Sequence, residues 1–139
     1  MILEVTAAER AARHPASELI VRLREMAEAK YEPEEPESHI SFLQINRRFH
    51  LTLAEAAVNY RIVDLLNGLF NEMERLFHLG LRLRDSSEEM RREHRDLITA
   101  LENGDVETAR TVISDQILAS RDRILEAVLQ GELHSIQIG

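Results

Sequence analysis

Hydrophobic residues along this chain recur at intervals of three and four, which is the spacing of one face of an α-helix, and strand-like alternation is absent. Only five glycines and three prolines interrupt the pattern. It predicts six helices, over residues 3–13, 17–30, 39–58, 61–83, 88–103 and 106–130. Short connections favour antiparallel neighbours, so the predicted fold class is all-α, an antiparallel helical bundle of about six helices in a single domain, residues 1–139.

Several helix ends carry recognisable signals. Ser86 is followed three residues later by Glu89, the spacing of a capping box at a helix start. Gly104 fits the left-handed residue that commonly ends a helix, and Asp105 fits the N-cap of the next one. Gly131 is expected to end the last helix. These signals predict a tight hairpin between the last two helices.

Two polar residues lie on an apolar stripe of the third predicted helix. Asn46 and His50 are four residues apart and therefore share one face of a helix. Leu43, Leu53 and Ala57 continue the same stripe. The pattern therefore points both polar side chains toward the interior of the bundle.

The last two predicted helices repeat this feature. His94 lies between Met90 and Leu97 on an apolar stripe, and Gln116 lies among the apolar residues of the last helix. His94 comes eleven residues before Asp105, and Gln116 comes eleven residues after it. Residues equidistant from the turn of a hairpin lie at similar heights, so His94 and Gln116 are expected to face each other.

Burying an amide or imidazole without a partner costs about 1–3 kcal/mol. A small domain is stable by only about 5–15 kcal/mol, so several scattered unpaired groups would be hard to tolerate. We therefore expect Asn46, His50, His94 and Gln116 to converge on a central polar cavity that holds water, a metal or a small polar ligand. The alternative for any one of them is a structural role, bonded to a backbone carbonyl or a water.

Composition narrows the functional classes. The net charge is −8, so the chain should not bind nucleic acid by itself. Cysteine is absent, and no apolar run approaches the roughly 18 residues of a membrane span. The N-terminus lacks the layout of a signal peptide, so a cytoplasmic location is expected. Glu-x-x-His, His-Glu-x-x-His and Gly-rich phosphate loops do not occur, which argues against an enzyme.

Three segments together resemble one family. They are "LEVTAAERAAR", "NRRFHLTLAEAAVN" and "EHRDLITALENGDVETAR". The last is the most specific, because it joins a histidine, a turn and a following alanine at fixed offsets. The chain is similar over nearly its whole length to the C-terminal effector-binding (FCD) domain of FadR-type regulators in the GntR superfamily.

The resemblance implies a metal site that this chain has altered. Many members bind a divalent metal through an Asp and a His four residues apart and two further His residues on the hairpin. His50 and His94 match, whereas Asn46 stands at the Asp position and Gln116 at the last His position. One zinc- or nickel-like ion remains an expectation, held by His50 and His94 with Asn46 and Gln116 as weak substitutes. The alternative is a metal-free pocket in which these four residues bind a ligand directly.

The resemblance also implies an effector and partners. The effector would be a small organic acid, and Arg75, Arg82 and Arg84 are candidates for a carboxylate clamp or simply surface arginines. The family implies a homodimer, with the helix at residues 60–84 as a candidate interface. DNA contact would belong to a winged helix-turn-helix domain, which the sequence lacks, so the chain is expected to be a piece of a longer regulator or a stand-alone effector domain.

The sequence leaves two functional hypotheses. The first is the ligand-sensing and dimerisation domain of a transcriptional regulator. The second is a structural dimerisation domain with a degenerate, non-binding pocket, which the two substituted ligand positions make credible.

Overall fold

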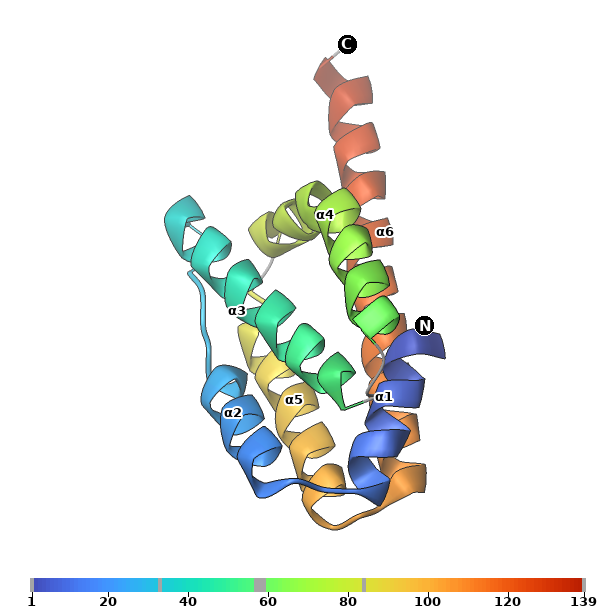
Figure 1. The fold of residues 1–139 in the computed structure, drawn as a ribbon. Coiled ribbons are helices and arrows are strands. Elements are labelled where there is room, and N and C mark those ends of the chain that lie inside the picture. The colour runs from blue at the N-terminus through green and yellow to red at the C-terminus, as the bar shows by residue number, and fades with distance from the viewer. Residues whose placement is uncertain (1, 33, 57–59, 84, 139) are drawn as a thin grey trace.

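The computed structural model describes residues 2–32, 34–56, 60–83 and 85–138, and only the backbone for residues 2, 80, 82, 83 and 131–138. Within these ranges the chain forms helices and no strands, which confirms the predicted all-α bundle. The helices are α1 (Ile2–Arg13), α2 (Ser17–Ala27), α3 (Pro36–Glu55), α4 (Tyr60–Leu83), α5 (Ser87–Glu102) and α6 (Val106–Ile138). Figure 1 shows α6 running along the bundle and extending beyond the other helices.

Several predicted boundaries are wrong. The second helix ends at Ala27 rather than at residue 30, and the third ends at Glu55 rather than at residue 58. The third helix begins at Pro36, three residues earlier than predicted, because proline fits the first turn of a helix, where its missing N–H is not needed. The last helix does not stop at Gly131 but continues to Ile138. A glycine inside a helix costs only about 1 kcal/mol relative to alanine, so the helix-forming residues around it can carry the helix through.

The hairpin between α5 and α6 follows the predicted signals. Gly104 adopts φ 65°, the left-handed conformation that ends α5. Asp105 then caps α6, because its Oδ1 accepts from the Thr108 backbone N–H at 3.1 Å and its Oδ2 from the Thr108 hydroxyl at 2.6 Å. These hydrogen bonds hold the pKa of the Asp105 carboxyl below its usual value. The turn is therefore fixed from both sides.

The predicted capping box at the start of α5 is not formed. Ser86 makes no side-chain capping bond. Asp85 takes over this role, since its Oδ1 accepts from the Ser87 hydroxyl at 2.6 Å and from the Ser87 N–H at 2.9 Å. Both bonds favour the ionised carboxylate and lower the pKa of Asp85.

The main core lies where α1, α2, α3, α5 and α6 meet. Four alanines on one side of α1 are almost fully buried and let its backbone approach the other helices closely. Large side chains from the other helices fill the rest. The main core, so named from here on, comprises the buried residues Ala7, Ala8, Ala11, Ala12, Ile20, Leu23, Ala27, Phe49, Leu53, Leu97, Ile98, Ala100, Leu101, Ala109 and Ile113.

A second, smaller cluster joins the α2–α3 connection to α4 and α5. It consists of Tyr31, Phe42, Leu81 and Met90. The Tyr31 hydroxyl accepts from the backbone N–H of Ser86 at 2.7 Å and thereby satisfies a buried donor at the start of α5. His39, to which the sequence assigned no role, is fully buried beside this cluster, with Nε2 2.8 Å from the Glu32 carbonyl oxygen.

Helix α4 packs against α3 and α6. The Arg47 guanidinium links α3 to α4. Its Nε donates to Asn67 Oδ1 at 3.0 Å, and its Nη2 donates to Asn71 Oδ1 at 2.7 Å. None of the helices in the described part of the chain is both long and apolar enough to span a bilayer. The space bounded by α3, α4 and α6 is not filled by side chains and forms the candidate site.

Candidate functional site

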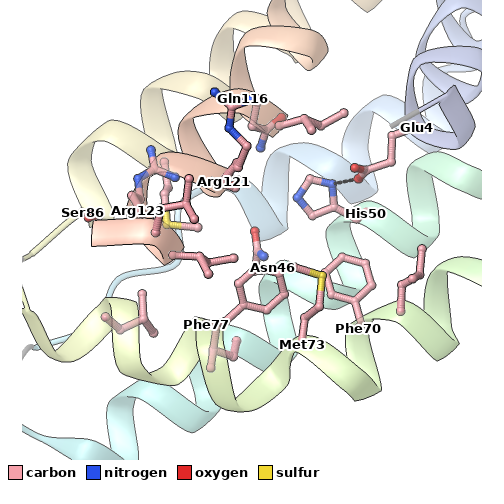
Figure 2. A pocket seen from close by; sticks show the side chains of 18 residues that line it. Glu4, Asn46, His50, Phe70, Met73, Phe77, Ser86, Gln116, Arg121 and Arg123 are labelled. Atoms are coloured by element: carbon pink, nitrogen blue, oxygen red, sulfur yellow. Dashed lines mark ion pairs between the residues drawn. The ribbon is translucent and has the colours of Figure 1, made fainter. Parts of the chain in front are cut away.

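A cavity of about 470 Å³ lies between α3, α4 and α6 and reaches α1 and the start of α5 (Figure 2). Ten of the eighteen lining residues that the structure describes are apolar, so the described lining is less polar than the sequence predicted. The apolar residues are Leu43, Leu69, Phe70, Met73, Phe77, Leu81, Met90, Ile117, Ile124 and Leu125. The polar residues are Glu4, Asn46, His50, Ser86, Gln116, Ser120, Arg121 and Arg123.

Three of the four polar residues singled out by the sequence line this cavity together. Asn46 and His50 come from α3 and Gln116 comes from α6. The Asn46 Oδ1 and Gln116 Oε1 atoms are buried without a hydrogen-bond partner in the protein. Unpartnered buried acceptors are uncommon and costly, so each of these atoms lacks a hydrogen-bond partner that a buried polar group normally has.

His94 lies directly behind this lining. Its ring stacks on Phe49 with centroids 4.1 Å apart and lies 5.7 Å from the ring of His50. Burial, reinforced by the charges of His50 and Arg123, lowers the pKa of His94 to about 3, so its imidazole is neutral at neutral pH. Its Nε2 is also buried without a partner.

Glu4 on α1 is the main polar residue that sequence reasoning missed. Its Oε1 lies 2.5 Å from His50 Nδ1, and both side chains are less than a tenth exposed. Burial raises the pKa of the Glu4 carboxyl, but the charge and hydrogen bond of His50 outweigh it, so the net shift is downward. Figure 2 shows this pair at one end of the cavity, with Asn46 further along.

Arg123 on α6 is the second missed residue. Its side chain is only 11% exposed, and its Nη2 donates to Glu93 Oε1 at 2.6 Å and to Glu89 Oε2 at 3.4 Å. Burial raises the pKa of Glu93, although Arg123 opposes this shift. Arg123 Nε is buried and has no partner. The neighbouring Arg121 is 62% exposed and contacts Asp122.

Of the three arginines suggested by the sequence, only Arg75 has its side chain in the described part of the chain, and it does not line the cavity. Arg75 is exposed on α4. Arg82 belongs to α4, but its side chain lies outside the described part, and Arg84 lies outside the described residues. Where the structure describes them, the cationic residues at the cavity are instead Arg121 and Arg123.

The missed residues had a detectable signal. Glu4 precedes Ala7, Ala8 and Ala11 at spacings of three, four and seven, so it lies on the buried face of α1. Arg123 follows Gln116 by seven residues, which is two turns along one face of α6. His94 was identified as a polar residue on an apolar helix face, and the same pattern would have identified Glu4 and Arg123.

The metal expectation can be tested against the donors present. Among the described residues, no group of three or more His, Cys, Asp or Glu is placed to hold a metal. His50 Nδ1 is engaged by Glu4, and besides the His94 imidazole the predicted ligand set offers only the neutral amides of Asn46 and Gln116. Two imidazoles with amide oxygens are a poor donor set for zinc or nickel, so the site does not fit a firmly held ion of that kind.

Comparison with known proteins adds the family. The family model described as the FCD domain matches residues 1–119 of the chain. A search of curated proteins finds no match.

Proposed function

Because the chain belongs to the FCD family, the effector-binding domain of FadR-type GntR regulators, we propose that it is the ligand-sensing and dimerisation domain of such a transcriptional regulator. The family is non-enzymatic, which agrees with the prediction that the chain is not an enzyme. The proposed ligand is a small carboxylated metabolite in the cavity. The observation that carries this proposal is that Asn46, His50 and Gln116 line one cavity with two unpartnered buried oxygens.

The proposed binding mode needs no firmly held metal. The unpartnered Nε–H of Arg123 is the donor for the carboxylate, since a hydrogen bond between a guanidinium and a carboxylate is among the stronger ones in proteins. Asn46 Oδ1 and Gln116 Oε1 accept from a hydroxyl or amino group elsewhere on the ligand. Satisfying buried polar atoms removes part of their desolvation penalty, which favours the occupied state.

The proposed mechanism is a shift between two helix arrangements. A ligand that contacts α3 and α6 also lies against the Glu4–His50 pair, so it senses the position of α1 as well. Ligand binding favours the helix arrangement that makes these contacts best. The size of the shift is set by the ratio of the ligand's affinities for the two arrangements. A winged helix-turn-helix domain of the regulator would contact the DNA, and a cytoplasmic location follows from that role.

The homodimer is also part of the proposal. On α4, the interface candidate from the sequence, Tyr60 and Leu65 are exposed large hydrophobic residues, at 72% and 58%. On α6, Leu118, Leu125 and Leu129 are exposed at spacings of seven and four, so they share one face. We propose that this α6 face pairs with a second copy. Light scattering on Leu129→Glu tests this pairing, because Leu129 is exposed on that face and is not among the cavity-lining residues. We expect a monomer, and an unchanged dimer would contradict the proposal.

The ligand proposal is tested by thermal shift with a panel of organic acids and divalent ions. Gln116→Leu removes an unpartnered oxygen from the cavity, whereas Gln130→Leu makes the same change at an exposed position of the same helix. We expect at least one acid to raise the melting temperature of the wild type and of Gln130→Leu but much less that of Gln116→Leu. Equal shifts in both variants would contradict binding in this cavity.

The alternative, a structural dimerisation domain with a degenerate pocket, predicts a different outcome. No acid in the panel would then stabilise any of the three proteins. Elemental analysis of protein purified without metal-affinity resin adds a second readout. We expect less than about 0.1 zinc or nickel per chain, in line with the weak donor set, and a stoichiometric ion would overturn the metal-free binding mode.

A further inference from the structure

The cavity walls indicate which class of acid binds. We propose, resting on the function proposed above, that the effector is a monocarboxylic acid with an apolar body, alkyl or aromatic. Its carboxylate binds at Arg123, and its body lies on the apolar face of α4. This excludes polyhydroxylated acids and acids with two or three carboxylates.

The first support is the apolar wall supplied by α4. Leu69, Phe70, Met73 and Phe77 line the cavity at spacings of one, three and four, so one continuous face of the helix is turned toward it. All four side chains are only half-buried. Such a wall holds water poorly, because water in a cavity needs two to four polar partners. An apolar ligand body removes this wall from water, which is favourable.

The second support is the size of the cavity. Its volume of about 470 Å³ falls within the range of about 300–1,000 Å³ for small-molecule sites. An acid of two to four carbons would leave most of the apolar wall uncovered. A body of roughly eight carbons, or one aromatic ring with a short chain, gains contact along the wall, since each buried methylene adds about 0.8 kcal/mol.

The third support is the charge around the cavity. Figure 2 shows Arg123 and Ser86 at one end and Glu4 and His50 at the other. Glu4 already occupies the imidazole at its end, whereas Arg123 keeps one unpartnered N–H, so the acid group is assigned to the Arg123 end. Arg123 is already compensated by Glu93, and Arg121 contacts Asp122. Among the residues whose side chains the structure describes, the cavity therefore offers an N–H donor for one carboxylate and no unpaired arginine for a second or third.

Isothermal titration calorimetry with a homologous series tests this inference. The probes are butanoate, hexanoate, octanoate and 4-phenylbutanoate, compared with succinate, citrate and gluconate. We expect the affinity to rise about fourfold for each added methylene, so octanoate should bind on the order of 100-fold more tightly than butanoate. Succinate, citrate and gluconate should show no binding at the same concentrations.

Variants locate the two ends of the ligand. Arg123→Lys keeps the positive charge but removes the Nε–H, and we expect it to weaken octanoate binding about tenfold. Phe77→Trp narrows the cavity and should weaken octanoate more than butanoate. Gln130→Leu, at an exposed position of α6, should bind the whole series as the wild type does.

The outcomes separate this inference from the proposed function. Binding that rises with chain length and weakens in Arg123→Lys supports both. Binding of succinate or gluconate that weakens in Gln116→Leu, with no dependence on chain length, overturns the apolar class and leaves the sensing function in place. If no acid binds any of the proteins, the sensing function itself is wrong. Equal octanoate binding in wild type and Arg123→Lys contradicts the carboxylate position.

Discussion

The bundle has two halves that use apolar residues differently. In the main core, Phe49, Leu97 and Leu101 are completely buried and packed among five helices. Around the cavity, Phe70 and Phe77 are of similar size but only half-buried. Close packing stabilises a fold, whereas apolar groups that face a hollow contribute little until something covers them. We interpret the packed half as the scaffold and the hollow half as the binding site.

The largest expected effect comes from truncating one phenylalanine in each half. Phe49→Ala removes a fully buried ring and should lower the free energy of unfolding by about 3–5 kcal/mol. Phe77→Ala removes a ring that already borders a cavity, so we expect a loss of about 1 kcal/mol or less. Urea denaturation measures both. Similar losses for the two variants would mean that the halves do not differ in packing.

A second effect is the pH dependence contributed by His94, which lies behind the cavity against Phe49. Above its unfolded pKa of about 6.5 the residue is neutral in both states, and its contribution to stability is complete. Its folded pKa is lowered to about 3, so between pH 6.5 and 3 only the unfolded state gains the proton, and stability falls as the pH falls. From pH 7 to pH 5 this loss is about 2 kcal/mol.

Denaturation of the wild type and of His94→Gln at both pH values isolates this contribution, because the variant side chain does not titrate. The variant should lose about 2 kcal/mol less than the wild type between pH 7 and pH 5. An identical loss in the two proteins would show that His94 is protonated in the folded state and is less buried than described.

The chain's two tyrosines give a smaller, matched comparison. Tyr31→Phe removes the hydroxyl that accepts from the buried Ser86 N–H beside the cavity, and we expect a loss of about 1–2 kcal/mol. Tyr60→Phe changes a side chain that is 72% exposed and should have an effect within about 0.5 kcal/mol. Thermal denaturation suffices to rank them. A Tyr31→Phe protein as stable as the wild type would show that the hydroxyl does not hold the start of α5.

The smallest effects concern two glycines, one in each half. Gly104→Ala puts a side chain on a residue with φ 65°, which should cost about 1 kcal/mol, although the added Cβ would lie 3.5 Å from the nearest atom and would not clash. Gly68→Ala lies within α4 with nothing near its Cβ, so it should stabilise the protein by about 0.5–1 kcal/mol. Shifts of the same sign would contradict one of the two backbone assignments.

The sequence predicted the helices because their apolar stripes and the Gly104–Asp105 turn are local signals. It also predicted that Asn46, His50 and Gln116 point inward, since spacing along a helix determines which face a residue occupies. Local spacing places Glu4 on the buried face of α1, but it does not show that Glu4 meets His50, which is 46 positions away. The apolar wall of α4 was not predicted, and the helix at residues 60–84 was considered as a dimer interface, because spacing alone does not distinguish a face packed against a helix from one that borders a hollow. Gly131 was misread as a helix end because a single glycine costs a helix only about 1 kcal/mol, so the residues around it can continue the helix.

The methionines allow the division into two halves to be tested within one sample. Met73 and Met90 line the cavity, whereas Met26 packs against the main core. Protein labelled with ¹³C at the methionine methyl groups can be titrated with octanoate and followed by NMR. We expect the Met73 and Met90 methyl signals to shift and saturate together while the Met26 signal stays in place. Unchanged signals for Met73 and Met90, or an equal shift of all three, would contradict a binding site in this cavity.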